Sequence, residues 1–488
     1  MAVTALPENW ISCRLGDLLA FEYGKSLTKS ARSGNGEYPV FGSSGVVGLH
    51  DAYLVEGPVI IVGRKGAAGS VCYSEANCWP IDTTYYIRSG QFLNSKFVYY
   101  LLHSLNLAKL ETSTAIPGLN REKAYDETVF LPPLAEQHRI VAKIEELFSE
   151  LDQGVASLKA AREQLKVYRQ SLLKNAFEGK LTVAWRAAHA DQLESATVLQ
   201  QRIARERQAR YQQQLADWQT AGQTGPKPKP PKPLPPLTAE ELAELPELPA
   251  GWVFVRAEEI ADFITKGTTP SKELLFSGNG DIPFIKVYNL TTTGLLDFSI
   301  DPTFVSKETH QGFLSRSKVY PGDVLMNIVG PPLGKVSIVP PTYPEWNINQ
   351  AIAIFRTTAI TPKLLAKYLA HETTVRSMMR KSKATAGQFN LTLEICRETL
   401  IPLCGKLEQQ HIELLIDEKL SEADQLELTL ATALQQADAL RQAILKKAFH
   451  GQLVPQDQND EPATALLERI RTANANGIQK PGKRGKTG

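Results

Sequence analysis

The chain has 488 residues, enough for several domains, and its 43% hydrophobic and 22% charged residues are ordinary for a soluble globular protein. Its net charge is only +2, from 54 Lys and Arg against 52 Asp and Glu, which excludes a gross basic footprint for nucleic acid. The sequence has no run of eighteen apolar residues, no secretory signal and no CxxC among its five cysteines. We therefore expect a cytoplasmic protein without a membrane span, disulfide scaffold or zinc site.

Residues 1–134 predict a globular domain, the first head, which opens with Leu6-Pro7-x-x-Trp10. Short β-branched runs such as Pro58–Gly63, separated by Gly and Pro, indicate strands and turns. A helical stretch follows at Ser95–Lys109. The mixture predicts an α+β (mixed α/β) fold.

Residues 135–181 predict the first long helix. Apolar residues such as Ile140, Ile144, Leu147 and Leu151 recur at helical spacing, and Gly179 stands where a C-terminal cap belongs. A helix of this length measures roughly 60 Å. Residues 182–247 then predict a helical extension and a semi-rigid, Pro-rich linker.

Residues 248–403 predict a second head with the same landmarks. Leu248-Pro249-x-x-Trp252 repeats the opening motif, and Asp323–Gly330 parallels the strand-rich run of the first head. A helical stretch follows again, at Pro362–Lys381. The offset between matching residues grows from 242 at the tryptophans (252 − 10) to 272 in the helices (408 − 136), so this head holds 30 extra residues.

Residues 404–453 predict the second long helix, because Glu408–Leu453 aligns with Glu136–Leu181 without a gap and 20 of the 46 positions are identical. Such a repeat predicts two copies of one part with a pseudo-twofold relation, whose helices pair as a coiled coil. We expect the identical positions to serve helix pairing and partner binding; they include Glu136/Glu408, Arg169/Arg441 and Phe177/Phe449. Residues 454–488 predict a C-terminal extension and a basic, disordered tail.

Catalytic signatures are absent from the sequence. It contains no G-x-x-x-x-G-K-[ST], no H-E-x-x-H and no Asn/Asp-Pro-Pro-Tyr/Phe, and the eight histidines are scattered. This pattern favours a binding role. Two alternatives stay open: a coiled-coil scaffold whose heads bind protein, and an enzyme with an unrecognised site.

The duplicated order of head and helix resembles the specificity (S) subunits of type I restriction–modification enzymes. The resemblance rests on Leu131-Pro132-Pro133-Leu134-x-Glu136-Gln137, on the Ala-Phe-x-Gly-x-Leu that ends each helix, and on the Leu-Pro-x-x-Trp that opens each head. The second copy of the first motif departs from the pattern, since Ile401-Pro402-Leu403 lacks one proline.

The resemblance implies a non-catalytic reader of double-stranded DNA. Each head would be a target recognition domain for one half of a bipartite, asymmetric site, and the helices would set the spacing. Two M (methyltransferase) subunits would dock on the helices and methylate adenine, and two R (restriction) subunits would translocate and cleave. The chain itself would bind no cofactor; S-adenosylmethionine, ATP and Mg²⁺ would belong to the partner subunits.

Candidate DNA-binding residues follow the predicted strands, on loops that offer donors and acceptors to bases or phosphates. In the first head they are Lys25, Ser43, Ser44, Arg64, Lys65 and Asn120. In the second head they are Lys266, Thr268, Lys286, Tyr288, Asn289, Lys335, Gln388 and Asn390. Most exposed lysines and arginines are simply solvated. For each of these residues the alternative interpretation is a solvated surface side chain without a role in binding.

Overall fold

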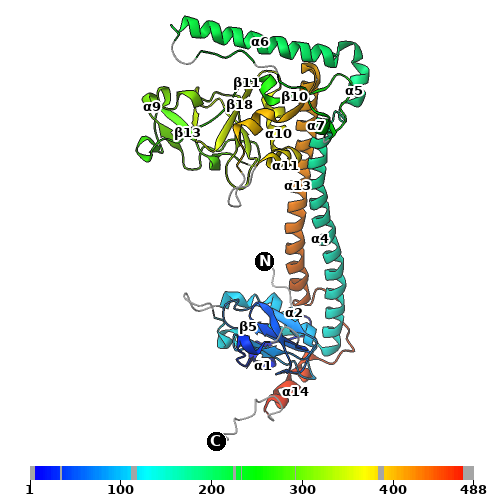
Figure 1. Cartoon of the computed structure of the whole chain (residues 1–488). Coiled ribbons are helices and arrows are strands. Elements are labelled where there is room, and N and C mark those ends of the chain that lie inside the picture. Colours follow the sequence, from blue (N-terminus) through cyan, green and yellow to red (C-terminus); the bar gives the residue numbers. More distant parts are fainter. Residues whose placement is uncertain are drawn as a thin grey trace. The chain divides into compact units, whose positions relative to one another are not determined.

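The computed structural model describes residues 6–32, 36–110, 118–223, 227–231, 234–243, 245–291, 293–382 and 390–475. The chain forms two compact units, one of residues 1–161 with 429–488 and one of residues 162–428. Each unit holds one head together with parts of both long helices, α4 (Leu134–Phe177) and α13 (Lys406–Ala448), drawn in Figure 1. The expected fold class is confirmed, but the units do not follow the linear order of the segments.

The described residues of the first head form three small sheets. Strands β1 (Ile11–Arg14) and β9 (Thr128–Leu131) pair with each other. A four-stranded sheet has the order β2 (Glu22–Tyr23), β8 (Thr84–Ile87), β5 (Val59–Gly63) and β6 (Val71–Ser74), and all five residues of β5 are buried. A three-stranded sheet has the order β4 (Gly45–His50), β3 (Tyr38–Gly42) and β7 (Trp79–Pro80). The helices are α1 (Leu15–Leu18), α2 (Ser95–Ser104) and α3 (Arg121–Tyr125).

The second head repeats this topology with one strand more in its last sheet. Strands β10 (Val253–Arg256) and β19 (Leu400–Leu403) pair with each other. The main sheet has the order β11 (Ala261–Lys266), β18 (Ile352–Thr357), β15 (Val324–Asn327) and β16 (Val336–Ile338). The remaining sheet has the order β12 (Phe276–Ser277), β14 (Thr303–Val305), β13 (Ile282–Ile285) and β17 (Asn347–Ile348). Its helices are α8 (Ala257–Ile260), α9 (Lys307–Gln311), α10 (Pro362–Ala370), α11 (Glu372–Lys381) and α12 (Leu393–Glu398). Most of the extra residues lie between β13 and β15.

The two long helices pair antiparallel. In the first unit Arg441 of α13 contacts Asp152 of α4 as an ion pair. In the second unit Arg169 of α4 contacts Asp424 of α13 at 2.7 Å. The repeat offset of 272 relates Arg169 to Arg441 and Asp152 to Asp424. The two repeats therefore form the same ion pair, once in each unit.

The ends of the long helices confirm the capping prediction, because Gly179 and Gly451 each follow their helix at φ +68°, a left-handed conformation that favours glycine. The helical spacing of apolar residues also predicts that Tyr168 and Leu440 lie on the apolar stripe that each long helix buries, and this prediction is wrong at these two matched positions. Tyr168 is 43% and Leu440 is 51% exposed, because the helix pair covers only part of each helix surface.

The extensions that follow the long helices complete the cores of the heads. In the first unit α14 (Ala463–Ala475) buries Leu466, Leu467 and Ile470 in the core that contains Leu15. In the second unit α6 (Ala196–Thr220) buries Leu199 and Ile203 in the matching core. Two short helices, α5 (Val183–Ala188) and α7 (Ala239–Ala243), lie on either side of α6 in the chain.

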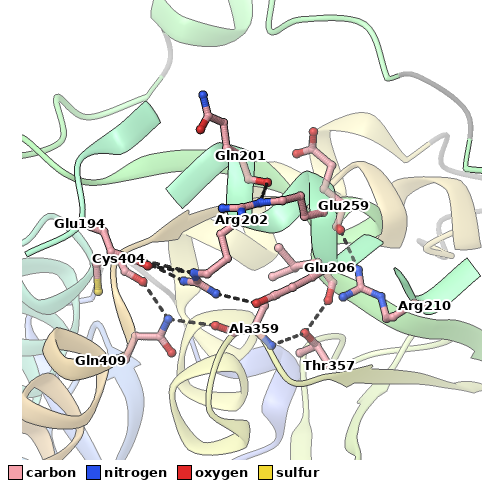
Figure 2. Close-up of polar contacts among 12 residues, drawn as sticks. Glu194, Gln201, Arg202, Glu206, Arg210, Glu259, Thr357, Ala359, Cys404 and Gln409 are labelled. Carbon is pink, nitrogen blue, oxygen red and sulfur yellow. Dashed lines mark hydrogen bonds and ion pairs between the residues drawn. The ribbon is translucent and has the colours of Figure 1, made fainter. Parts of the chain in front are cut away.

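Arg210 fixes α6 to the second head, and Arg202 stabilises the extension internally (Figure 2). Arg202 forms ion pairs with Glu194 at 3.1 Å and Glu206 at 3.0 Å. Arg210 donates to the carbonyl of Glu259 at 3.0 Å (Figure 2). It also pairs with Asp262 at 3.0 Å. The extension therefore belongs to the folded unit. Part of the predicted Pro-rich linker and the tail from residue 476 lie outside the described residues.

Candidate nucleic-acid interface

The repeated Glu-Gln pair at the start of each long helix holds the adjoining head. Glu136 accepts a hydrogen bond from Trp10 Nε1 at 3.0 Å, and Glu408 accepts one from Trp252 Nε1 at 2.9 Å. The backbone N–H of Asn94 donates to Gln137 Oε1 at 3.0 Å. We expected the identical positions to serve helix pairing and partner binding, but Glu136 and Glu408 bind the heads instead.

The phenylalanines that end the helices also contact the heads. The ring centroid of Phe449 lies 5.3 Å from that of Phe97, and the centroid of Phe177 lies 4.9 Å from that of Tyr368. Of the three identical pairs named above, only Arg169 and Arg441 pair the helices. The expectation of helix pairing is therefore confirmed for the arginines and wrong for the glutamates and phenylalanines, because a helix end has neighbours other than the second helix.

Both heads carry the same backbone frame at the end of the central strand. In the first head, Gly63 N donates to Ser70 O at 2.8 Å and Leu119 N donates to Arg64 O at 3.0 Å. In the second head, Asn327 N donates to Lys335 O at 3.0 Å and Leu391 N donates to Ile328 O at 2.9 Å. Because these hydrogen bonds are equivalent in the two heads, Arg64 and Ile328 occupy the same position in the fold, as do Ser70 and Lys335.

Neighbouring contacts extend the match. Lys65 bridges Gly118 in the first head, and Val329 bridges Asn390 in the second. Gly24 and Gly267 follow the matched strands β2 and β11, and a Cβ at either glycine would lie 2.1 Å from a carbonyl oxygen. The frame therefore fixes where the side chains of each loop emerge.

The side chains on this frame differ between the heads. The matched pairs, first head before second, are Tyr23/Lys266, Lys25/Thr268, Arg64/Ile328, Lys65/Val329, Ser70/Lys335 and Gly118/Asn390. One scaffold thus presents two different sets of donors, acceptors and apolar groups.

Cations and aromatic rings gather at this place in the first head. The guanidinium carbons of Arg64 and Arg121 each lie 5.4 Å from the ring centroid of Tyr23. Arg64 also donates to the carbonyl of Asp82 through Nε at 3.0 Å and through Nη2 at 2.6 Å. Lys65, next along the loop, is exposed. The arrangement offers positive charge beside an aromatic face, a combination suited to nucleic acid.

The other predicted residues of the first head are placed less directly. Exposed Lys25 lies over Trp79, with Nζ 5.9 Å from the ring centroid. Ser44 is exposed in the turn between β3 and β4, where Ser43 offers its carbonyl to the Ser70 hydroxyl. Asn120 caps α3 by accepting a hydrogen bond from Lys123 N at 3.1 Å, so its side chain already has a structural role.

The second head presents Lys266 as an exposed residue at the end of β11. Thr268 accepts a hydrogen bond from Arg316 at 3.2 Å. Lys335 is half-buried, and its backbone N–H donates to Asn327 Oδ1 at 2.9 Å. Asn390 is exposed beside Val329, and Gln388 lies outside the described residues.

Residues Lys286 to Asn289 form a separate turn of the second head. Lys286 and Tyr288 both bond to Asp301. Burial favours the neutral amine, but the hydrogen bonds with Tyr288 and Asp301 outweigh it and raise the pKa of Lys286. Asn289 is buried and donates to the carbonyls of Asp297 and Ile300 at 3.0 and 2.8 Å. We therefore exclude Asn289 from the candidate surface, because its amide serves the turn.

The candidate residues chosen from the sequence did not include Tyr23 or Arg316. Tyr23, Arg64 and Arg121 are far apart in the chain and only the fold brings them together, so no local pattern signals the cluster. In the described part of the chain, no group of three or more His, Cys, Asp or Glu side chains lies close enough to hold a metal ion. Nor does any described helix combine the length and apolar content that crossing a membrane requires.

Comparisons with known proteins match two separate segments of the chain, one for each head. The family model of the type I restriction modification DNA specificity domain matches residues 7–158 and 249–435. The EcoDI specificity subunit of Escherichia coli is 23% identical over 488 residues, covering 97% of both chains. The EcoBI specificity subunit of Escherichia coli is 25% identical over 402 residues, covering 78% of this chain and 72% of the relative.

Solved structures share the fold. A chain from a structural study of assembly and conformational transition in the type I R-M system matches with a TM-score of 0.60 and 19% identity, covering 92% of this chain and all of that one. The HsdS subunit from Thermoanaerobacter tengcongensis matches with a TM-score of 0.51 and 18% identity, covering 92% and 99%. On the evidence of two matched segments that together span most of its length, this chain belongs to the family of type I restriction–modification DNA specificity subunits.

Proposed function

We propose that each head of this specificity subunit reads one half of a bipartite, asymmetric DNA sequence. The observation that carries the proposal is the shared backbone frame, on which Arg64 is replaced by Ile328 and Lys65 by Val329. Base recognition depends on which donors, acceptors and apolar groups reach the groove. Two unlike sets on one frame suit two unlike half-sites.

The long helices are proposed to set the spacing between the half-sites. A helix rises 1.5 Å per residue, so the 44 residues of α4 measure roughly 66 Å. Ion pairs hold α4 to α13 in each unit, which supports a fixed register between the two helices. A fixed spacer between half-sites requires a rigid element of this kind.

We place catalysis in the partner subunits, in keeping with the family's role in specificity. Two methyltransferase subunits would dock on the helices and supply S-adenosylmethionine, and two restriction subunits would supply ATP-driven, Mg²⁺-dependent cleavage. Support for twofold docking comes from Tyr168 and Leu440, which are exposed apolar side chains at matched positions, one in each unit. A single exposed apolar side chain is ordinary on a protein surface. The support lies in its repetition at matched positions, once in each unit.

Methylome sequencing of cells that express this chain with its methyltransferase partner tests the reading role. We expect one asymmetric motif with two short specific parts and a fixed gap. Replacing residues 1–134 with the head of another family member should change one part and leave the other unchanged. A complex without sequence preference would contradict the proposal.

Matched insertions test the spacing role. Seven residues inserted after Ala160 and seven after Thr432 would lengthen both helices by about 10 Å while keeping the apolar stripe in phase. We expect both half-sites to persist with a gap longer by about three base pairs, at roughly 3.4 Å each. An unchanged gap would argue against the helices as the spacing element.

Docking is tested by mass measurement of the assembled complex. Tyr168→Glu or Leu440→Glu should each remove one methyltransferase subunit, and the double variant should remove both. Because both side chains are exposed, the fold of the chain should not change. Exposed Leu414→Glu serves as the control, since the matched residue of the other helix is Ala142 and no large apolar side chain repeats there.

A further inference from the structure

Arg64 is a positioned cation without a carboxylate partner. Its Nε and Nη2 both donate to the carbonyl of Asp82, and its guanidinium lies against Tyr23, which is 55% exposed. Across the described residues, no Asp or Glu forms an ion pair with Arg64. In contrast, Arg88 and Arg121 in the same head are paired with Glu22 and Glu122.

The geometry of Arg64 suits a base better than a phosphate. The carbonyl of Asp82 and the ring of Tyr23 fix the plane of the guanidinium, and a fixed planar fork matches the O6 and N7 acceptors of guanine. Phosphate contacts position a protein on DNA, so we would expect such contacts to recur with the frame that is repeated in both heads. Arg64 does not recur: the matched residue is Ile328, which is only 2% exposed.

The second head supplies different chemistry at the same place. The exposed residue next to Ile328 is Val329, and it bridges Asn390. Lys266 replaces Tyr23, so the aromatic platform is also missing. A guanidinium contact from this position is therefore available to the first head alone.

Building on the proposed function, we propose that Arg64 reads a guanine in the half-site of the first head, with Tyr23 as a positioning residue. The guanidinium would donate two hydrogen bonds to O6 and N7 from the major groove. The second head lacks this contact, so its half-site is read without a guanine contact at the matched position.

The test uses the complex of the full chain with its methyltransferase partner, and the head swap described above identifies the half-site of the first head. Each guanine of that half-site is replaced in turn by 7-deazaguanine, which lacks the N7 acceptor. We expect the affinity of the wild-type complex to fall at least several-fold for one guanine. The Arg64→Gln complex should lose this sensitivity, and its preference for guanine at that position should fall roughly 5- to 150-fold.

Two variants sharpen the result. Arg64→Lys, which keeps the charge, should retain part of the guanine preference. Arg14→Ala removes an equally positive but exposed side chain from the same head and should leave the motif unchanged. The proposal is overturned if Arg64→Gln weakens all sequences equally, if the relaxed position is an A·T pair, or if the wild-type complex tolerates 7-deazaguanine at every position. The measurement with 7-deazaguanine uses the wild-type complex, so it does not depend on whether any variant folds. A wild-type complex with no sequence preference would instead refute the proposed function itself.

Discussion

Trp252 donates a hydrogen bond of 2.9 Å from its indole Nε1 to the buried carboxylate of Glu408, and so joins the start of the second head to the start of the second long helix. The first unit repeats the bond between Trp10 and Glu136. The other partners of the two carboxylates differ. Arg186 pairs with Glu408 at 2.7 Å, whereas the neutral amide of Gln456 donates to Glu136 at 2.8 Å.

This difference predicts unequal costs for one substitution. Glu408→Gln leaves the guanidinium of Arg186, with 13% of its side chain exposed, without a carboxylate, and should destabilise the second unit by about 3 kcal/mol. Glu136→Gln keeps an acceptor for Trp10 and faces only an amide, so the first unit should change by less than about 1 kcal/mol. Because a chain of two units need not unfold in one step, hydrogen exchange of each unit is the measurement. Equal effects would contradict the assigned roles.

The pH dependence of the first unit should report Glu136. Burial raises the pKa of Glu136 above its ordinary value of 4.5, and the hydrogen bonds from Trp10 and Gln456 only partly oppose the shift. The folded state then holds the proton more tightly than the unfolded state. The contribution of Glu136 to the free energy of unfolding is therefore fully present below pH 4.5. It is lost as the pH rises through the raised pKa of the folded state. The stability of Glu136→Gln relative to wild type should accordingly increase over this window, as measured by hydrogen exchange at several pH values; a constant difference would argue against the shift.

The C-terminal helix α14 should be essential to the first head. Leu466 is 1% exposed, so Leu466→Ala should cost the first unit about 2–5 kcal/mol through lost burial and a residual cavity. Leu199→Ala should do the same in the second unit, where α6 takes the matching role. Leu440→Ala, at an exposed apolar residue, is the control and should change stability by less than about 0.5 kcal/mol. Hydrogen exchange assigns each loss to its unit, and a loss spread over both would contradict this division.

The ion pair between Arg169 and Asp424 should act through charge and contribute little. Both side chains are partly exposed, so Asp424→Arg should cost less than about 1 kcal/mol at low salt. Arg169 also pairs with Glu427 at 2.9 Å. The double variant Asp424→Arg with Arg169→Asp should therefore recover only part of that loss, and added salt should reduce both effects. Hydrogen exchange of the second unit at two salt concentrations measures the cycle. Effects that do not change with salt would show that packing, not charge, governs this contact.

By itself the sequence determined the parts and their order: two heads, two long helices and the glycine caps at Gly179 and Gly451. These features depend on local spacing and on backbone conformations that neighbouring residues dictate, and a gapless repeat makes them visible twice.

The tertiary structure alone decided which parts pack together. A Cβ at Gly451 would lie 2.4 Å from Pro7, and one at Gly179 would lie 2.4 Å from Pro249, so each head abuts the end of the long helix that belongs to the other repeat. The grouping of Tyr23, Arg64 and Arg121 likewise brings together the end of β2, the turn after β5 and the start of α3. Contacts between residues so distant in the chain leave no periodic trace in the sequence, because they are selected by the packing of whole elements and not by the spacing of neighbours.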